Sequence, residues 1–228
     1  MIAGTGPRYS DSTDGGLYFS RDIRGDKKLS AANDYSGKTP SSIVFDADTW
    51  KRFYVADGET VWKGAATSST SVTFGRAALD LAAIKIERPT ALEFISYNGV
   101  SALLVGGMQS DTSDQSPIAV AMNKAGDLDP AKPFGANLPN AVVNLLSYNA
   151  TVDVLAVGLW GRGVWTLYDV TSYFPTADKL IYGMADNNSQ PDEYYLSNGN
   201  KASRDLVKMG TGTLTIEGKA TYSGSTTV

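Results

Sequence analysis

The sequence contains no cysteine and no histidine among its 228 residues. Without cysteine there is no disulfide framework, no thiolate metal site and no cysteine nucleophile. Without histidine there is no imidazole ligand and no Ser-His-Asp triad, because the general base of that triad is missing. Any catalysis by this chain would therefore rely on carboxylates, tyrosine, lysine or arginine, and no cofactor motif is present.

Concentrated charge and long apolar runs are also missing. The net charge is −4 and Lys and Arg form no run, which argues against nucleic acid as a partner because such binding needs a basic surface. No apolar stretch approaches the roughly 18 residues of a membrane span, and Met1–Ser10 has no signal-peptide core. Hydrophobic residues still make up 42% of the chain, which supplies a core and excludes global disorder.

Short apolar runs bounded by Gly, Asn, Asp and Ser fill most of the chain. This pattern is typical of strands and turns. The best helical candidate, Ala77–Ile84, is kept short by Pro89 and a flanking Thr/Ser-rich run. The chain is therefore predicted to be all-β.

One pattern recurs along the chain: a strand, a polar turn and a second strand that ends in small residues. Val55, Val105 and Val157 mark the second strands, at spacings of 50 and 52 residues. A period near 50 residues with about four strands per unit predicts β-propeller blades, which bury their faces by packing against one another. A generic β-sandwich is the alternative.

Third strands extend the pattern. They are expected at Val61–Lys63 and Val164–Leu167, and Gly16–Ser20 looks like the third strand of an earlier, incomplete unit. Residues 1–176 are therefore predicted to form about four propeller blades, some incomplete, in an open ring.

After Pro175 the composition changes. Ala185–Asn200 is rich in Asp, Asn, Ser and Gly, and residues 177–204 are predicted to be a linker or irregular segment. Leu214 and Ile216 then alternate with polar residues between glycines. Short strands joined at glycine corners are typical of a β-solenoid, so 205–228 is predicted to be its first repeat, in a fragment of a longer protein.

The segment Asp205–Val228 closely resembles the autotransporter-associated β-strand repeat of bacterial autotransporters, L-x-K-x-G-x-G-T-L-T-L-x-G…Y-x-G-x-T-x-V. The matching positions are Leu206, Lys208, Gly210, Gly212, Thr213, Leu214, Thr215, Gly218, Tyr222, Gly224, Thr226 and Val228, with Ile216 for the last Leu. The resemblance implies the β-helical stem of a passenger exported to the cell surface or beyond. It also implies a membrane barrel in a C-terminal part that is not present here.

The upstream region resembles the sialidase/sortilin-type propellers, whose blades often carry an Asp-box turn, S-x-D-x-G-x-T-W. Gly15–Asp22 resembles the approach to such a turn, but Gly25 comes one residue late and no Trp follows. Leu155–Leu167 resembles a late blade of this family, with Gly161–Gly163 as the hairpin between its second and third strands. The Asp-box is a structural turn, so the resemblance implies a fold and not catalysis.

Carboxylate pairs are the candidate catalytic groups, because glycoside hydrolases place two of them about 5 to 10 Å apart. The candidates are Asp46, Asp48, Asp57, Asp127, Asp129 and Asp153. Asp48 and Asp153 are predicted to lie in solvated turns, and Asp57 in an Asp-Gly hairpin. No spacing ties a second carboxylate to any of them, and no arginine cluster of the sialidase kind is evident, so no catalytic residue is predicted.

Two loops offer oxygen ligands for Ca²⁺, Asp111–Asp114 and Asp186–Asn188, but neither has the spacing of a calcium loop, so no metal site is predicted. Trp160 and Arg162 combine a stacking surface with a bidentate donor. We therefore predict that they bind a ligand, either a carbohydrate or a host-surface molecule. Trp165 is expected in the core.

The resulting prediction is a non-enzymatic passenger region of a cell-surface or secreted autotransporter that uses its propeller for adhesion or ligand binding. One alternative is a carbohydrate-active propeller hydrolase, sialidase- or xyloglucanase-like, that uses paired carboxylates. A second is a structural spacer without a ligand.

Overall fold

The computed structural model describes residues 2–4, 16–20, 29–67, 71–97, 99–110, 116–124, 126–135, 138–174, 179–182, 188–190, 203–208, 214–216 and 220–228. Strands carry nearly all the regular structure of these residues, which confirms the all-β prediction. The described residues contain a single helical element, the 3-10 turn η1 at Val170–Tyr173. The helical candidate Ala77–Ile84 contains turns and no helix.

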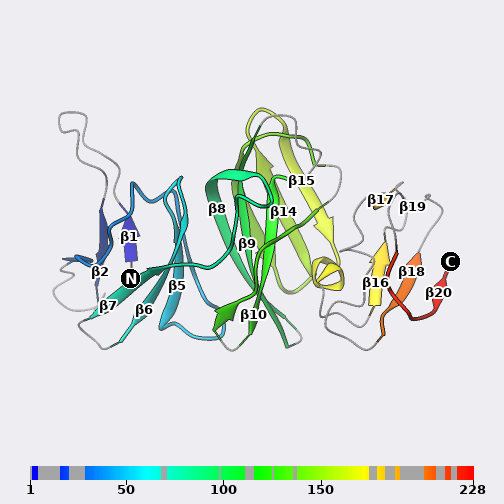
Figure 1. Ribbon diagram of the computed structural model, residues 1–228, viewed down its shortest axis with the longest axis horizontal. Coiled ribbons are helices and arrows are strands. Elements are labelled where there is room, and N and C mark those ends of the chain that lie inside the picture. Colours follow the sequence, from blue (N-terminus) through cyan, green and yellow to red (C-terminus); the bar gives the residue numbers. More distant parts are fainter. Residues whose placement is uncertain are drawn as a thin grey trace.

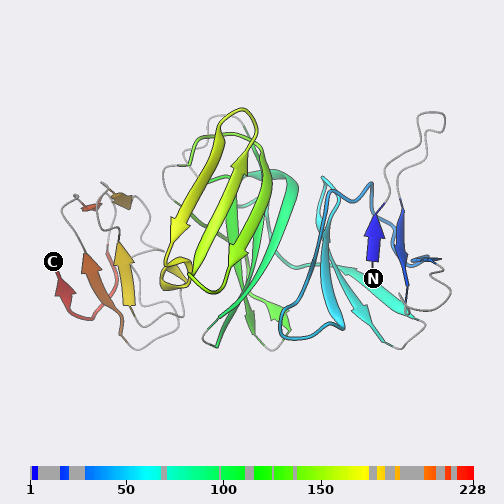
Figure 2. The same ribbon diagram turned by 180° about the vertical axis from the view of Figure 1, so that it is seen from behind.

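Four antiparallel sheets follow one another along the chain, and we call them blades 1 to 4 (Figure 1). Blade 1 is β1 (Ile2–Gly4), β2 (Leu17–Phe19) and β3 (Ser30–Ala31); blade 2 is β4 (Ser42–Phe45), β5 (Arg52–Ala56), β6 (Val61–Ala66) and β7 (Val72–Arg76). Blade 3 is β8 (Ile86–Tyr97), β9 (Val100–Gln109), β10 (Ile118–Lys124) and β11 (Asp127–Leu128), with β12 (Lys132–Pro133) also on β10; blade 4 is β13 (Val143–Asn149), β14 (Val154–Leu159) and β15 (Gly163–Tyr168). Figure 2 shows the same row of blades from behind.

The three marker valines occupy equivalent places in blades 2, 3 and 4, which confirms the repeat. Each lies in the second strand, between one partner in the first strand and one in the third. The pairings are Ile43–Val55–Trp62, Leu92–Val105–Ala119 and Leu146–Val157–Trp165.

Blades 2, 3 and 4 each pack one face against the blade before, and we call each such contact a seam. Val55 shares a buried cluster with Leu17 of blade 1. Val105 shares the next cluster with Tyr54 of blade 2, and Val157 shares a third with Leu104 of blade 3. Because side chains alternate along a strand, the residue after each valine points to the following blade.

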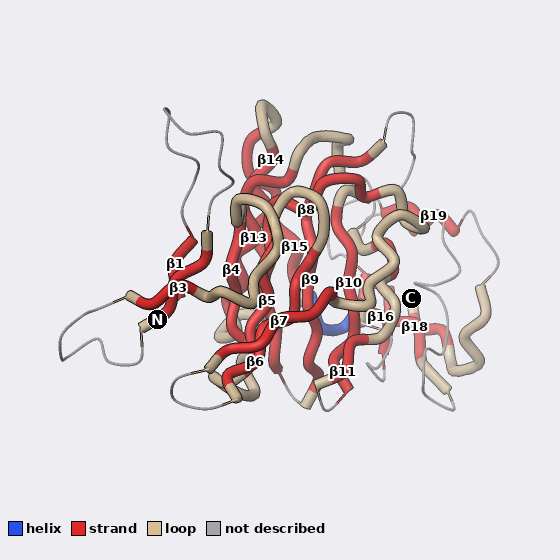
Figure 3. Tube along the Cα trace, turned by 60° about the vertical axis from the view of Figure 1, so that its left-hand side comes forward, coloured by secondary structure: helices blue, strands red, loops and turns tan. Residues whose placement is uncertain are grey.

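The C-terminal region changes from antiparallel to parallel pairing. Strands β16 (Lys179–Tyr182), β18 (Asp205–Lys208) and β20 (Thr226–Thr227) form one parallel sheet. Strands β17 (Asn188–Gln190) and β19 (Leu214–Ile216) form another. Parallel strands from successive turns of the chain are the pairing of a β-solenoid, as predicted. The tube in Figure 3 follows these strands beside the blades.

Two of these strands, β16 and β17, lie within 177–204, where the sequence predicted a linker or irregular segment. Their partners are the strands one coil later, with Leu180 opposite Leu206 and Asn188 opposite Leu214. A solenoid strand takes its backbone hydrogen bonds from the neighbouring coil, so a polar sequence can form one without strong apolar alternation.

Gly224 confirms one of the predicted glycine corners. A Cβ at this position would lie 2.1 Å from the main-chain oxygen of Arg204, and the Gly224 N–H donates to that oxygen at 2.9 Å. Only glycine allows this approach without displacing the backbone. The other corners, at 210, 212 and 218, lie outside the described residues.

Candidate ligand-binding site

The predicted ligand residues lie on the hairpin that joins β14 to β15. Gly161 and Gly163 adopt positive φ values of 70° and 78°, which turns the chain sharply on both sides of Arg162. The Trp160 N–H donates to the Val142 oxygen at 2.9 Å and anchors the hairpin to blade 4. The Trp160 side chain is 71% exposed, so it offers an aromatic surface to solvent.

Trp165, expected in the core, is 42% exposed instead. Its strand, β15, is the last strand of blade 4, and among the described residues no fourth strand pairs with it. In blade 2, by contrast, β7 covers β6 and the equivalent Trp62 is buried. The Trp165 Nε1 donates to the Arg162 oxygen at 3.2 Å and so braces the hairpin that carries the ligand residues.

A depression of about 380 Å³ lies where blades 2 and 3 meet. We call its side of the molecule the hairpin end, because the β5–β6 hairpin forms part of the wall. The lining residues are Lys38, Thr39, Asp57, Gly58, Glu59, Arg88 and Thr90. Thr90 also bonds the oxygen of Val143, next to the Val142 that anchors Trp160. The depression and the Trp160 hairpin therefore lie at the same end of the blades.

A second cavity of about 520 Å³ adjoins the first and shares Glu59 with it. Its apolar walls include Val61, Leu79 and Ile86. Its lining residues also include Asp80 and Lys85, whose φ values of 47° and 62° are unusual for side-chain-bearing residues. Its size falls within the range of small-molecule sites.

Asp57 lines the depression at the hairpin end, and both oxygens of its carboxylate accept hydrogen bonds from the protein. Its carboxylate accepts from the main-chain N–H groups of Lys38, Glu59 and Thr60, and from Trp62 Nε1 at 2.7 Å. Burial alone would raise the pKa of Asp57, but these hydrogen bonds outweigh it and hold the pKa below its usual value. Asp57 as a whole residue is 6% exposed, and its carboxylate holds the predicted Asp-Gly turn in place, with Gly58 at φ 80°.

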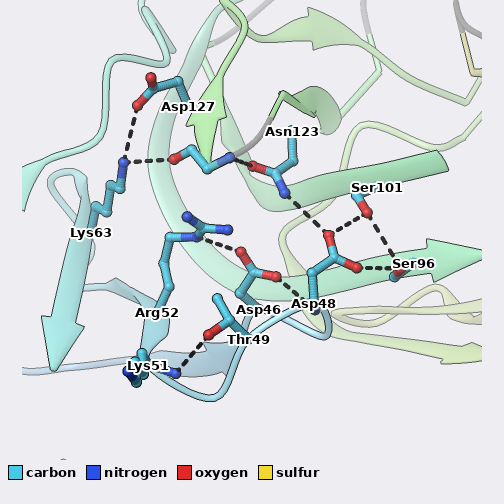
Figure 4. A network of polar contacts seen from close by, with 11 residues as sticks. Asp46, Asp48, Thr49, Lys51, Arg52, Lys63, Ser96, Ser101, Asn123 and Asp127 are labelled. Atoms are coloured by element: carbon cyan, nitrogen blue, oxygen red, sulfur yellow. Dashed lines mark hydrogen bonds and ion pairs between the residues drawn. The ribbon is translucent and has the colours of Figure 1, made fainter. Parts of the chain in front are cut away.

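At the opposite end of blades 2 and 3, Asp46 and Asp48 belong to a polar network (Figure 4). Buried Asp46 accepts from Arg52 Nε at 2.5 Å. Asp48 accepts from Ser96 Oγ at 2.6 Å and Ser101 Oγ at 2.5 Å. The Asp46 bond braces the β4–β5 turn within blade 2, and the Asp48 bonds tie that turn to blade 3. Both carboxylates thus serve structural contacts instead of forming a free acid/base pair.

Asn123 and Lys63 extend this network. The Asn123 side chain donates to Asp48 at 3.4 Å, while Lys63 Nζ donates to the Gly126 oxygen at 2.6 Å and pairs with Asp127 at 3.3 Å. Burial would raise the pKa of Asp48, but its hydrogen bonds and nearby Arg52 outweigh this and lower it. The charged form of Asp48 therefore stabilises the contact between the blades.

The remaining candidate carboxylates are also engaged. Asp129 pairs with Lys124 at 2.8 Å. Asp153, predicted to be solvated, accepts from Tyr148 Oη at 2.8 Å and Thr171 Oγ1 at 2.7 Å. Asp153 thereby links the β13–β14 turn to η1.

Among the described residues no group of three carboxylates could hold a metal ion. Of the two loops considered for Ca²⁺, Asp111–Asp114 lies outside the described residues and only Asn188 of the other is described. No helix in the described part of the chain is long and apolar enough to cross a membrane.

The sequence did not reveal the cavities, nor the exposure of Trp50. Trp50 is 71% exposed, like Trp160, and Lys51 Nζ lies 5.8 Å from its ring centre. Trp50 lies in the β4–β5 turn, at the end of the blades opposite to the cavities. The sequence shows only that the Asp57–Glu59 turn and Arg88 are charged. They line the same cavity because blades 2 and 3 pack against each other.

Comparison with known proteins finds a matching family profile and similar solved structures. A profile of the family described as Passenger-associated-transport-repeat matches residues 206–228. The chain is also similar to the solved structure of the Pseudomonas aeruginosa periplasmic gluconolactonase PpgL, at 15% identity and a TM-score of 0.50, over 75% of this chain and 50% of that chain. The chain thus spans half the length of that protein. No curated protein matches the chain.

At this identity the gluconolactonase likeness shows the fold alone, which is propeller-like. Together with the strand pairing, it shows a partial β-propeller followed by the start of a β-solenoid.

Proposed function

We propose that this chain is a non-enzymatic passenger region of a cell-surface or secreted autotransporter. The observation that carries the proposal is the parallel pairing of β18 with β20 within the segment that matches the passenger repeat, Leu206–Val228. The family is one of passenger-associated repeats, and the segment has the coil geometry that such a repeat needs. Export to the cell surface follows from that assignment.

We further propose that the blades bind a ligand at the hairpin end, through Trp160 and Arg162. Support comes from the exposure of Trp160, from the left-handed glycines that hold Arg162 between them, and from the cavities at the same end. An indole face and a guanidinium suit a sugar ring that carries an acidic group. The ligand class is therefore an acidic carbohydrate of a host or cell surface.

Enzymatic turnover is disfavoured by the engagement of the carboxylates. Among the described candidates, Asp46, Asp48, Asp57 and Asp153 each hold a turn or join two elements through hydrogen bonds. A glycoside hydrolase needs one carboxyl group to donate a proton and another to attack or to activate water.

Two measurements test the proposal. Protease treatment of intact cells that express the whole gene product should remove the blades, because a passenger is exposed outside the cell. Recovery of the chain only after cell lysis would contradict export.

Binding to immobilised acidic and neutral glycans tests the ligand site. Trp160→Ala should weaken binding to acidic glycans by about tenfold or more. Trp50→Ala is the matched control, because the two rings are equally exposed, and it should leave binding unchanged. Equal losses in both variants, or turnover of a glycan that disappears with an Asp→Asn change, would contradict the proposed site.

A further inference from the structure

The cavity of about 520 Å³ between blades 2 and 3 has an apolar floor and a charged mouth. Val61, Leu79 and Ile86 line it and are buried, so they form the floor. The charged lining residues are exposed instead, and they are Glu59, Asp80, Lys85 and Glu87. An apolar surface with a few polar groups at its entrance is the usual form of a small-molecule site.

The loop between β7 and β8 forms one wall of this cavity, and main-chain hydrogen bonds hold it in place. The Lys85 N–H donates to the Ala82 oxygen at 3.1 Å. The Ile86 N–H donates to the Leu81 oxygen at 3.1 Å, which closes the turn. The Ser110 N–H donates to the Lys85 oxygen at 3.0 Å and fastens the loop to the end of β9. These contacts fix the wall without help from a ligand.

The charged groups at the mouth do not neutralise one another. Within the described residues, neither Lys85 nor any of the three carboxylates forms an ion pair. Because the lining contains three carboxylates and a single ammonium group, it carries a net negative charge. The cavity therefore favours a cation over an anion.

The arrangement of the carboxylates favours an organic cation over a metal ion. The part of the chain that the structure describes contains no group of three acidic side chains that could hold a metal, and a bare divalent cation needs several oxygen ligands around it. The negative charge is instead spread over the mouth, above an apolar floor. An ammonium group on an aliphatic body matches both parts of the cavity.

Gln109 adds a polar side chain without a partner. It is 4% exposed, and its amide nitrogen and oxygen both lack a hydrogen bond within the described residues. Gln109 pairs with Ile86 and precedes Ser110, and both of these line the cavity. Because directly paired residues project from the same face of a sheet, the Gln109 side chain lies on the same face as Ile86. Buried amides are nearly always hydrogen-bonded, so this amide is suited to a polar group that enters the cavity.

We infer that this cavity binds a small organic cation, an ammonium group carried on an aliphatic body. The body covers the apolar floor, and the ammonium lies among the carboxylates at the mouth. Gln109 Oε1 is a further acceptor for an N–H of the ligand. The inference goes beyond the proposed function, because this site lies between blades 2 and 3 and takes a ligand opposite in charge to the acidic carbohydrate assigned to Trp160.

Titration of the intact chain with pentylammonium chloride, followed by ¹H–¹⁵N NMR, tests the inference. We expect saturable shifts with a Kd of about 1 mM, largest for the main-chain amides of Asp80, Lys85 and Ser110. Hexanoate carries the same pentyl group and the opposite charge. It should bind about tenfold more weakly or worse.

Two variants locate the binding. Ala82 is exposed and lines the cavity, so Ala82→Phe should block the mouth and abolish binding while the core stays intact. Asp80→Asn combined with Glu87→Gln should raise the Kd about fivefold, because it removes two exposed carboxylates. Asp34→Asn combined with Asp129→Asn is the matched control, since it changes the net charge equally outside the cavity, and it should leave the Kd unchanged.

The changed positions at the mouth are exposed, so these variants should keep the wild-type circular dichroism spectrum. The absence of saturable shifts with pentylammonium would overturn the inference. Equal affinities for pentylammonium and hexanoate, or a Kd that Ala82→Phe leaves unchanged, would overturn it as well. Trp160→Ala should leave pentylammonium binding unchanged while it weakens binding to acidic glycans, so the failure of one site can be told from the failure of the other.

Discussion

The seam between blades 2 and 3 and the seam between blades 3 and 4 follow the same design but treat carboxylates in opposite ways. At the first, Asp48 is ringed by donors from Ser96, Ser101 and Asn123, which lower its pKa. At the second, Glu93 accepts from the Tyr148 N–H at 3.3 Å, and burial raises its pKa. A shared backbone scaffold therefore leaves the polar chemistry of each seam free to vary.

The apolar parts differ as well. At the first seam Tyr54 and Phe94 stack with ring centres 6.0 Å apart. At the second the closest approach is between backbone and side chain, at Gly106 and Val143. The first seam thus combines a stacked aromatic pair with the network around Asp48, and the second combines close packing at Gly106 and Val143 with hydrogen bonds that involve Thr90 and Glu93. Mutations should distinguish the two.

The largest effect is expected for Gly106→Ala in the second seam. The added Cβ would lie 2.4 Å from Val143 Cγ1, so blades 3 and 4 must separate or repack. Overpacking of this kind should lower the free energy of unfolding by about 2 to 3 kcal/mol, measured by urea denaturation. Gly75→Ala is the control, because a Cβ there meets nothing within 4 Å. Equal free energies of unfolding for the two variants would show that blades 3 and 4 repack around the added Cβ without cost, which would contradict the prediction.

A smaller effect is expected for Asp48→Ala in the first seam. The change removes three hydrogen bonds to blade 3, but solvent reaches the carboxylate, so the loss should be about 1 kcal/mol. Asp129→Ala, which breaks the exposed pair with Lys124 within blade 3, is the comparison and should change stability by less than about 0.5 kcal/mol. A larger loss of unfolding free energy in Asp129→Ala than in Asp48→Ala would contradict the role of Asp48 in joining blades 2 and 3.

These seams also show what could be predicted from the sequence. The strands around Val55, Val105 and Val157 were found because alternation and turn residues are local signals. The Gly224 corner was found through a repeat motif. The strands follow from neighbouring residues, whereas the Gly224 corner approaches Arg204 and was found because the motif itself carries the glycine.

Features that depend on distant partners were missed. The exposure of Trp165 depends on whether a fourth strand covers β15, and the identical dipeptide Val-Trp is buried in blade 2, where β7 is present. The cavity at the hairpin end is lined by Glu59 of blade 2 and Arg88 of blade 3, which blade packing places at its wall. The strands β16 and β17 form because a neighbouring coil supplies hydrogen bonds.

The smallest predicted effect has opposite signs at the two seams and depends on pH. Because the pKa of Asp48 is lowered in the folded state, its contribution to stability is present above the usual Asp pKa and is lost as pH falls through the folded value. Because the pKa of Glu93 is raised, the folded chain holds a proton that the unfolded chain has released. Stability therefore falls as pH rises from the usual Glu pKa through the raised value.

Glu93→Gln removes that cost and keeps an oxygen for the Tyr148 N–H. We expect it to stabilise the protein at pH 7 and to have no effect at a pH below the usual Glu pKa. Asp48→Asn should instead destabilise at pH 7, with the difference shrinking in acid. Urea denaturation of both variants across this pH range measures the two slopes. If the stability difference from the wild type changed with pH in the same direction for both variants, the two seams would not differ in the sign of their pKa shifts.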